Sequence, residues 1–329
     1  MKTDLQKYRE PEQLVLEFFI LEEEDQQKYS QSIELYDAIP KYIWSRVKRD
    51  ENGFLPTLKR KFKHKNHEYE VQIRPARLFN KEGEEKHYYP GIREEIVEDA
   101  LRKIATEGRI ERVDGEPKKN LGIVFTLYEL KKELERTGHS YNNTQIKEAL
   151  RICSRTGLTV ICHSKGGSIE VDENMFPRLA LATRSEWDKD KQRAHVEFNS
   201  LVTKSIEKRT YRQINYERSM KLSSSLARWL HKRMSHNYKQ AQSFQNVYTI
   251  SLITIIRDSG MTAYKRLSDS KKYVMKSIDE LMKLDVIYKC DEEVTKDGKK
   301  LADVKFSLYP SLTFSSEMKR ANAKMKSIR

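Results

Sequence analysis

The sequence predicts an α+β protein in which one order of elements, helix, helix, turn, helix and β-hairpin, occurs twice. Two observations indicate the repeat. Apolar residues recur at helical spacing in several segments after residue 90, and short strand-like runs come after them. The segment at 248–290 also aligns with the segment at 125–163. The chain has 329 residues and can bury more than one core, so we expect two or three domains.

The N-terminal segment is expected to be a small α+β unit. Residues 69–74, YEVQIR, alternate between apolar and polar side chains, which is the period of a β-strand. An apolar run at 14–21 and a further element at 33–44 precede this strand. The tract at 82–91, EGEEKHYYPG, favours turns and is expected to separate this unit from the helices that begin after residue 90.

The first occurrence of the repeated order begins with a helix over 92–104, whose apolar residues form one stripe and which is expected to stop at Gly108. The next helix starts with a capping box, in which Glu129 lies three residues after Thr126. Asn143 is expected to cap a third helix. Two strand-like runs around a Gly-Gly turn then predict a β-hairpin.

The second occurrence begins with a long helix expected over 220–241. It is followed by a helix whose Thr249 aligns with Thr126, and then by a third helix and a longer hairpin around Asp297-Gly298. The order is typical of a winged helix-turn-helix, so we predict two tandem domains of this kind. The predicted boundaries are 1–88 for the N-terminal segment, 89–195 and 196–315 for the two winged-helix domains, and 316–329 for a basic tail.

The positive charge is concentrated in the C-terminal part of the chain. The net charge is +14, but residues 1–90 hold 17 basic and 17 acidic residues, and residues 91–190 hold 17 and 18. Residues 191–329 hold 29 basic against 14 acidic residues. Solubility alone would not leave the first 190 residues neutral. The asymmetry indicates a polyanionic partner of the C-terminal domain, and nucleic acid is the first candidate, because neutralised phosphates release counterions.

The candidate DNA-contacting residues are deduced from the geometry of a winged helix, whose third helix lies in the major groove. In the second domain they lie on the third helix, on the hairpin tip and on the preceding long helix: Lys271, Lys272, Tyr273, Lys276, Lys283, Lys296, Lys299, Lys300, Arg228, Lys232 and Lys239. The first domain offers Thr144, Gln145, Lys147, Arg151 and Arg155. Its neutral surroundings attract DNA weakly, so DNA contact and protein contact both remain open for this domain.

The sequence favours a protein that is not an enzyme. It has no GxGxxG and no GxxxxGK[ST], and we expect no cofactor. A nicking reaction would need a nucleophile such as Tyr211 or Tyr216 together with a metal, but two histidines as close as His64 and His67 do not point to one side of a strand. The pair Cys162 and His163 is too small for zinc. The acidic residues Glu94, Glu95, Glu98 and Asp99 are interpreted as solvated charge on a helix.

The remaining composition predicts a cytoplasmic protein with no membrane segment. No run reaches the about 20 consecutive apolar residues of a membrane span, and the N-terminus lacks the apolar stretch of a secretory signal. The three cysteines, Cys153, Cys162 and Cys290, form no CxxC pair and are expected to be reduced, mostly buried thiols.

The sequence resembles the replication initiator proteins of bacterial plasmids, the RepA-like group with two winged-helix domains. The resemblance lies in ELYDAIPKYIW at 34–44, YPGIREEIVEDALRKIA at 89–105 and SSSLARWLHKRMSHNY at 223–238, and in the tandem order. It implies binding to direct repeats, called iterons, at a replication origin, opening of that origin, and recruitment of the host initiator and replicative helicase. It also implies dimers that repress their own gene, with the first domain as the dimerising or accessory module.

Two further hypotheses concern partners and class. QLVLEF, Gln13 to Phe18, is similar to the peptide that replication proteins insert into the sliding clamp, but short patterns of this kind arise often by chance, and a buried strand or helix of the N-terminal unit is the favoured interpretation. The alternative function is a winged-helix transcriptional regulator, and a rolling-circle nicking enzyme is a more distant one. A regulator is normally shorter and carries an effector-binding domain, for which residues 1–90 offer no evident pocket.

Overall fold

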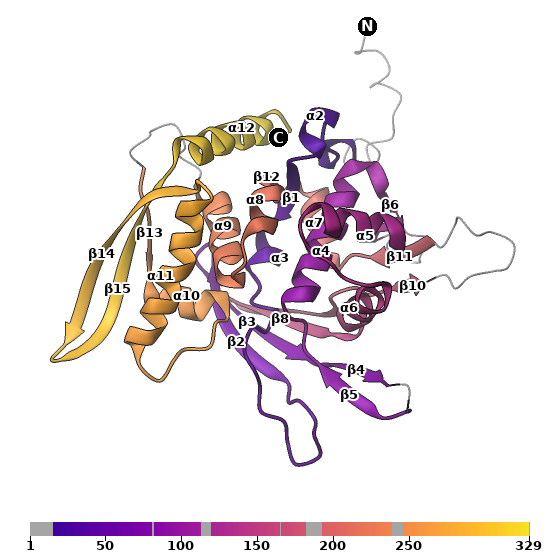
Figure 1. Ribbon diagram of the computed structural model, residues 1–329, viewed down its shortest axis with the longest axis horizontal. Coiled ribbons are helices and arrows are strands. Elements are labelled where there is room, and N and C mark those ends of the chain that lie inside the picture. Colours follow the sequence, from indigo (N-terminus) through magenta and orange to yellow (C-terminus); the bar gives the residue numbers. More distant parts are fainter. Residues whose placement is uncertain are drawn as a thin grey trace, which may run out of the picture.

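A computed structural model describes residues 16–80, 82–112, 120–164, 166–181, 193–238 and 246–328. The architecture is a mixed α+β fold, in agreement with the prediction (Figure 1). No helix of the described ranges is long and apolar enough to cross a bilayer.

The N-terminal unit is built around two hairpins. Its elements are α2 (Glu23–Gln26), β1 (Tyr29–Ile33), α3 (Glu34–Ala38), β2 (Leu58–His64), β3 (His67–Arg74), β4 (Ala76–Phe79) and β5 (Glu85–Tyr88). The strand predicted from residues 69–74 is confirmed as part of β3, with Val71 and Ile73 buried. The prediction of a turn over 82–91 is wrong in part, because residues 85–88 pair with β4 and only the residues before them turn.

The first repeat, defined as residues 92–174, contains the predicted helices. Its elements are α4 (Ile92–Ile104), the π-helical turn η2 (Ala105–Arg109), β6 (Ile110–Arg112), β7 (Leu121–Thr126), α5 (Leu127–Arg136), α6 (Asn143–Arg155), β8 (Gly157–Ser164) and β9 (Gly167–Asn174). Gly108, at φ +93°, ends the first helical stretch as expected. The capping box of Thr126 and Glu129 is confirmed. The cap of α6 is Asn142, not Asn143.

The hairpin of the first repeat does not stand alone. Strand β8 pairs with β3, so β8 and β9 extend the N-terminal hairpin into one sheet of order β2-β3-β8-β9. Strand β7 belongs to a different sheet, together with β6, β10 (Leu179–Leu181) and β11 (Arg193–Glu197). The strand and the hairpin of the first repeat are therefore held by different parts of the chain.

The second repeat, defined as residues 225–310, has a sheet of its own. Helix α7 (Ser200–Glu207), strand β12 (Tyr211–Asn215) and helix α8 (Tyr216–Lys221) precede it, and its elements are α9 (Ser225–Asn237), β13 (Tyr248–Ser251), α10 (Leu252–Ser259), α11 (Leu267–Lys283), β14 (Ile287–Asp297) and β15 (Lys300–Pro310). Its strands form one sheet of order β13-β15-β14.

Two local predictions for the second repeat are corrected. The long helix expected over 220–241 is interrupted, because the Ser224 hydroxyl accepts a hydrogen bond from the Ala227 amide and starts α9 there. The cap of α10 is Ser251 rather than Thr249, since Ser251 Oγ accepts from the Thr254 amide. The aligned helices α5 and α10 thus both start with a hydroxyl cap, and in α10 the cap lies two residues after Thr249.

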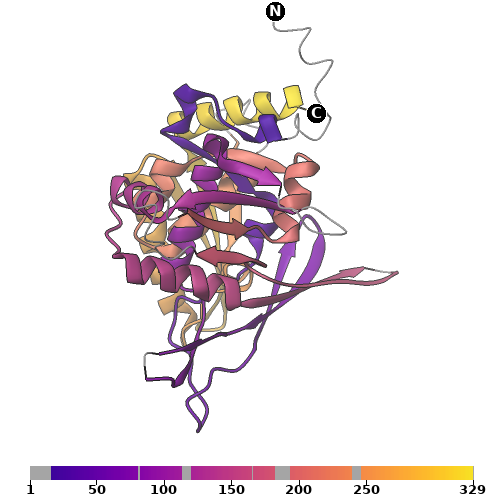
Figure 2. The same cartoon turned by 90° about the vertical axis from the view of Figure 1, so that its right-hand side faces the viewer.

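The last helix, α12 (Leu312–Ile328), includes residues 316–328 of the expected basic tail. It lies beside α2 over the two-stranded sheet β1-β12 (Figures 1 and 2). Asp25 of α2 accepts ion pairs from Arg320, at 2.9 Å, and from Lys324, at 2.5 Å. These contacts connect the C-terminal helix to the N-terminal unit.

The buried apolar residues divide into two main groups. Core 1 extends from Phe19 to Met220 and includes the N-terminal unit and the first repeat. Core 2 extends from Leu222 to Met318 and includes the second repeat and the start of α12. Trp44 packs against both groups. The N-terminal unit and the first repeat therefore share one core, and the second repeat has its own.

Candidate nucleic-acid interface

Helix α11 has one buried face and one lysine-rich face. Val274, Ile278 and Leu281 are buried in core 2, as the sequence predicts for the third helix of the second repeat. On the other face Lys272 is 78% exposed, and Lys276 and Lys283 are exposed as well. The apolar spacing that fixes the helix against core 2 is thus also what directs these ammonium groups toward solvent.

Two of the predicted contact residues on α11 are engaged within the fold. Lys271 forms an ion pair with Glu292 of β14. Tyr273 is half-buried against core 2, with its ring 6.1 Å from that of Tyr264. Lys271 therefore ties the helix to the base of the hairpin, and Tyr273 contributes packing.

The hairpin β14–β15 extends beyond the third strand of its sheet, which pairs only with Lys305–Leu308 of β15 (Figure 1). Gly298, at φ +58°, supplies the positive φ that the tight turn at the tip requires. The predicted contact residues Lys296, Lys299 and Lys300 lie at this tip and are exposed. The tip and the exposed face of α11 thus present lysines from the same small unit.

Ion pairs distinguish the base of the hairpin from its tip. At the base, Lys289 pairs with Asp291 at 2.8 Å and Lys305 with Glu293 at 3.3 Å. None of the ion pairs among the described residues includes the predicted contact residues Lys276, Lys283, Lys296, Lys299 and Lys300. These five ammonium groups are therefore available to phosphates, and Lys272 has only a 3.8 Å contact with Asp269.

The structure adds basic residues that were not predicted as contacts. The turn between α10 and α11 exposes Lys265 and Arg266. Arg46 is exposed in a loop of the N-terminal unit that reaches this turn, where the hydroxyls of Ser45 and Thr262 lie 2.6 Å apart. The charge run RVKR at 46–49 was visible in the sequence, but its contact with the second repeat spans more than 200 residues.

Helix α6 of the first repeat has fewer available cations than α11. Its predicted residues Thr144, Gln145, Arg151 and Arg155 are exposed, and Lys147 is partly exposed. Gln145 is used in the capping box, where its side chain accepts from the Asn142 amide at 2.9 Å. Arg155 donates to the carbonyl of Arg77 at 2.9 Å. Lys147 and Arg151 are therefore the basic groups that this helix can offer to a partner.

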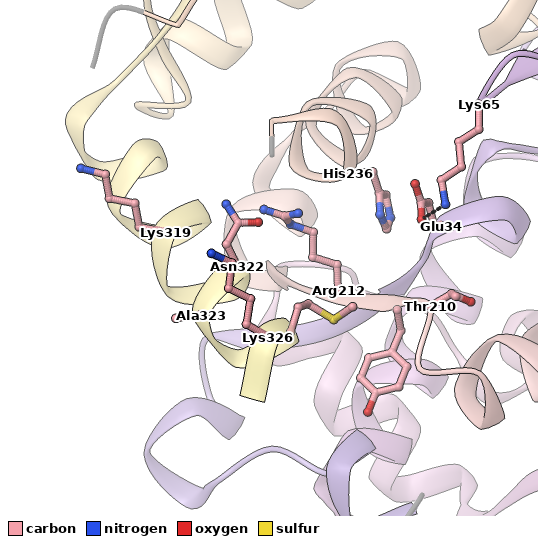
Figure 3. A pocket seen from close by; sticks show the side chains of 11 residues that line it. Glu34, Lys65, Thr210, Arg212, His236, Lys319, Asn322, Ala323 and Lys326 are labelled. Atoms are coloured by element: carbon pink, nitrogen blue, oxygen red, sulfur yellow. Dashed lines mark ion pairs between the residues drawn. The ribbon is translucent and has the colours of Figure 1, made fainter. Parts of the chain in front are cut away.

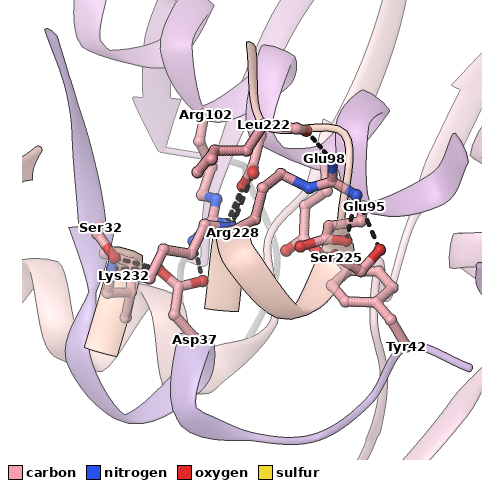
Figure 4. Close-up of polar contacts among 12 residues, drawn as sticks. Ser32, Asp37, Tyr42, Glu95, Glu98, Arg102, Leu222, Ser225, Arg228 and Lys232 are labelled. Atoms are coloured by element: carbon pink, nitrogen blue, oxygen red, sulfur yellow. Dashed lines mark hydrogen bonds and ion pairs between the residues drawn. The ribbon is translucent and has the colours of Figure 1, made fainter. Parts of the chain in front are cut away.

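The predictions for Arg228 and Lys232 are corrected, because both side chains are buried, at 1% and 7% exposure. Arg228 pairs with Glu95 at 3.1 Å and Lys232 with Asp99 at 2.7 Å (Figure 4). They connect α9 to α4 and have no surface to offer to DNA. Lys239, the third predicted residue of this region, lies outside the described residues.

The interpretation of the acidic residues of α4 as solvated charge is also wrong, because these side chains are buried rather than exposed to solvent. Glu94, Glu95, Glu98 and Asp99 are all buried. Arg102 joins Asp99, at 2.6 Å, to Asp37 of α3, at 2.5 Å, so the ion pairs form a network. One signal was present in the sequence: Glu95 and Asp99 are four residues apart, as are Arg228 and Lys232, so two helix faces with this spacing can pair.

The network sets the protonation state of its carboxylates. Burial opposes ionisation of Asp37, but the guanidinium of Arg102 and the ammonium groups of Lys232 and Lys41 hold its pKa far below the usual range. In the same way, Lys232 and Arg102 outweigh burial and lower the pKa of Asp99. The charged network is therefore intact at neutral pH.

The residues weighed for nicking chemistry are not assembled into a site. Tyr211 and Tyr216 are both buried. His64 and His67 face each other across the β2–β3 turn. Within the described ranges, no three or more His, Cys, Asp and Glu side chains are grouped so that they could hold a metal ion.

The segment considered as a sliding-clamp peptide, Gln13 to Phe18, lies partly outside the described residues, which begin at Leu16. Leu16 packs against core 1, and the Phe18 ring lies 4.6 Å from the guanidinium carbon of Arg209. The described part of the segment is therefore in contact with the body of the protein.

Comparisons with known proteins find similarity among solved structures only, since no family model and no curated protein sequence matches the chain. The chain is similar to a selenomethionine crystal structure of domains 2 and 3 of RctB, with a TM-score of 0.49, 9% identity, and coverage of 84% of this chain and 96% of that chain. A second structure of RctB domains 2–3 has a TM-score of 0.48 and 7% identity, with coverage of 87% of this chain and 99% of that chain. The Pi initiator protein in complex with iteron DNA has a TM-score of 0.44 and 15% identity, with coverage of 72% of this chain and 98% of that chain. These TM-scores are too low to support a function.

Proposed function

We propose that the protein is a plasmid replication initiator that binds direct repeats at the origin through its second repeat. The observation that carries the proposal is the set of exposed lysines without ion-pair partners in the described chain, on α11 and at the β14–β15 tip. They belong to one unit with its own core and its own three-stranded sheet. The order of elements in this unit, α9, β13, α10, α11 and the β14–β15 hairpin, supports the proposal of a winged helix.

In this proposal the two parts of the interface have different roles. Helix α11 enters the major groove, where a lysine such as Lys272 or Lys276 can bind guanine O6 and N7 as well as phosphates. The hairpin tip contacts the neighbouring phosphates or the minor groove. The carboxylates at the hairpin base neutralise Lys289 and Lys305, so the two groups of available lysines act as separate contacts rather than as one uniform patch.

We propose that the first repeat is also a winged helix and that its role is accessory. Its hairpin is part of a sheet with the N-terminal unit, and α6 offers fewer cations than α11. These features support protein contact, such as dimerisation, or assistance to DNA binding by the second repeat. Autorepression by a dimer, origin opening, and recruitment of the host initiator, the replicative helicase and the sliding clamp are proposed from the sequence resemblance. We propose no enzymatic activity and no cofactor.

DNase I footprinting of the purified full chain on the DNA that flanks its own gene tests the proposal. We expect protection of regularly spaced direct repeats, because several identical sites place several copies of the protein along an origin. Protection of a single inverted repeat over the promoter, with no repeats nearby, would contradict the initiator function and favour a transcriptional regulator with the same fold. Metal-dependent cleavage of supercoiled DNA in the same samples would contradict the non-enzymatic proposal.

A further inference from the structure

A cavity of about 430 Å³ lies between strand β12, the end of α9 and the C-terminal helix α12. Figure 3 shows the guanidinium of Arg212 between Asn322 of α12 and the ring of His236. Lys319 and Lys326 line the cavity from α12. They are seven residues apart and therefore share one face of the helix. With Lys65, the cavity is thus lined by cationic side chains from parts of the chain that are distant in sequence.

Arg212 is a buried cation that lacks a carboxylate partner. Its side chain belongs to a residue that is only 7% exposed, and none of the ion pairs among the described residues includes it. Its Nη2 has a 3.4 Å contact with the Met318 carbonyl, and its Nε has no hydrogen-bond partner in the described chain. Burial lowers the pKa of Arg212 to about 10 against a smaller opposing effect of Glu34. A buried guanidinium in this state is stabilised by an anion.

The acidic group nearest to the cavity is already neutralised. Glu34 lines the cavity, but it forms an ion pair with Lys65 at 2.6 Å. His236 adds no positive charge at neutral pH, because burial lowers its pKa to about 4. The cations on the other side of α12 also have partners, since Arg320 and Lys324 both pair with Asp25. The cations without a described carboxylate partner that lie close together in the cavity are therefore Arg212 and Lys326, because the ammonium group of Lys319 points away from Arg212 (Figure 3).

We propose that this cavity binds the phosphate group of a small molecule, either free phosphate or the phosphates of a nucleotide. A planar guanidinium suits bidentate contact with phosphate oxygens, and the ammonium group of Lys326 adds a second positive charge for a dianion. The volume is within the range of about 300–1,000 Å³ that is usual for small-molecule sites. This site is separate from the lysines of α11 and the hairpin tip, so the proposal does not depend on the proposed DNA interface.

A neighbouring hollow of about 220 Å³ favours a ligand larger than inorganic phosphate. It shares Tyr211 and Met325 with the cavity. It is also lined by Gln31 and Gln213, and both polar atoms of the buried Gln213 amide are without a partner in the described chain. These groups can hydrogen-bond a part of the ligand beyond its phosphate.

Isothermal titration calorimetry of the full chain with inorganic phosphate, ATP and adenosine, at constant ionic strength, tests the proposal. We expect saturable binding of phosphate or ATP and none of adenosine. Tighter binding of ATP than of phosphate would identify a nucleotide as the source, and equal binding would identify free phosphate. No saturable binding of either phosphate compound would overturn the proposal.

Variants of residues that line the cavity test whether the phosphate or ATP binds there. Arg212→Met is expected to weaken binding by on the order of tenfold or more, because a charge-assisted hydrogen bond is lost. Its fold should be retained, since Arg212 has no ion-pair partner among the described residues, and Lys326→Gln on α12 is a second variant with a smaller expected loss. Lys131→Gln on α5 is the matched control and should bind as the unmodified chain does. Equal binding by the Arg212→Met variant would overturn the proposal.

Measuring the affinity of the same variants for DNA tests whether the cavity instead receives phosphates of the DNA backbone. If the cavity holds a small molecule, Arg212→Met leaves the affinity for duplex DNA unchanged in phosphate-free buffer. A loss of DNA affinity in this variant, together with no binding of free phosphate or ATP, would show that the cavity receives the DNA backbone and would overturn the proposal.

Discussion

The two repeats share their order of helices but differ in how their hairpins are held. In the first repeat, β8 pairs with β3, and the hairpin becomes part of a sheet that includes the N-terminal unit. In the second repeat, the hairpin belongs to a sheet formed only by that repeat, and its tip extends freely. The available charge differs as well, because α11 and the hairpin tip expose five lysines that take part in no ion pair of the described residues, whereas α6 offers only Lys147 and Arg151. A hairpin that is built into a sheet is less available to enter a DNA groove than one with a free tip.

The first helices of the two repeats also differ, although they lie against each other. Helix α4 brings buried carboxylates, and α9 brings the buried cations that pair with them. The polar faces of these helices are therefore an internal interface between the repeats rather than solvated surfaces. Each repeat depends on the other to neutralise its buried charge.

The largest expected effect on stability comes from breaking this interface. Replacing Asp99 by Ala leaves Lys232 without its partner and removes one partner of Arg102. We expect the free energy of unfolding to fall by about 3–5 kcal/mol, the range for breaking a buried pair. Urea unfolding followed by circular dichroism measures it.

The matched control is the exposed pair of Lys272 and Asp269, where Asp269→Ala should change the free energy of unfolding by less than about 0.5 kcal/mol. In a double variant, Asp99→Leu with Lys232→Met, the loss should be smaller than the sum of the single losses. An Asp99→Ala variant as stable as the unmodified chain would show that the repeats are not coupled through these charges.

The second effect concerns pH and arises from two buried histidines of the second repeat. Burial lowers the pKa of His231 to about 3 and that of His236 to about 4, and both lie on α9. An unfolded histidine has a pKa near 6.5, so below this pH the unfolded chain binds more protons than the folded chain. Acidification from pH 6.5 to 4 therefore reduces stability, by about 1.4 kcal/mol per pH unit for each histidine.

Urea unfolding at pH 7, 6 and 5 measures this slope. His231→Phe should reduce the slope by about 1.4 kcal/mol per pH unit, the contribution of one proton. The substitution should be tolerated, since the ring nitrogens of His231 have no partner in the described chain and the ring lies 6.2 Å from that of Phe314. A slope that the substitution leaves unchanged would contradict the assignment. Helix α4 contains no histidine, so no corresponding loss is expected from the first helix of the first repeat.

The smallest expected effect on the free energy of unfolding comes from removing the N-terminal caps of the aligned helices α5 and α10. Thr126→Ala should lower the free energy of unfolding by about 1 kcal/mol, because it removes a cap that Glu129 reciprocates. Ser251→Ala should cost less, since Thr254, at the position that corresponds to Glu129, cannot accept the same reciprocal bond with a carboxylate. Thermal unfolding of the two variants measures the difference, and a larger loss for Ser251→Ala would reverse the ranking.

The sequence predicted features that depend on neighbouring residues. The buried stripe of α11, the strand at 69–74 and the capping box of Thr126 all arise from spacings of two to four residues, and the structure confirms them. The burial of Arg228 and Lys232 depends on carboxylates 133 residues away. The pairing of β8 with β3 and the cavity beside Arg212 likewise arise only when distant segments meet. A polar helix face therefore does not distinguish a DNA-binding surface from an internal interface until its partner helix is known.

DNA binding by equivalent pairs of basic residues on the two third helices decides which repeat is the main DNA-binding unit. One variant combines Lys272→Ala with Lys276→Ala on α11, and the matched variant combines Lys147→Ala with Arg151→Ala on α6. Affinity for the duplex protected in the footprint is measured by fluorescence anisotropy at several salt concentrations, with thermal unfolding to confirm that both variants are folded.

We expect the α11 variant to lose affinity by roughly tenfold to a hundredfold and to show a shallower dependence on salt, since each lost phosphate contact reduces the slope by about 1. The α6 variant should lose less than about threefold, because its surroundings are neutral. An equal or larger loss for the α6 variant, or unchanged affinity for the α11 variant, would contradict the assignment of the second repeat as the main DNA-binding unit.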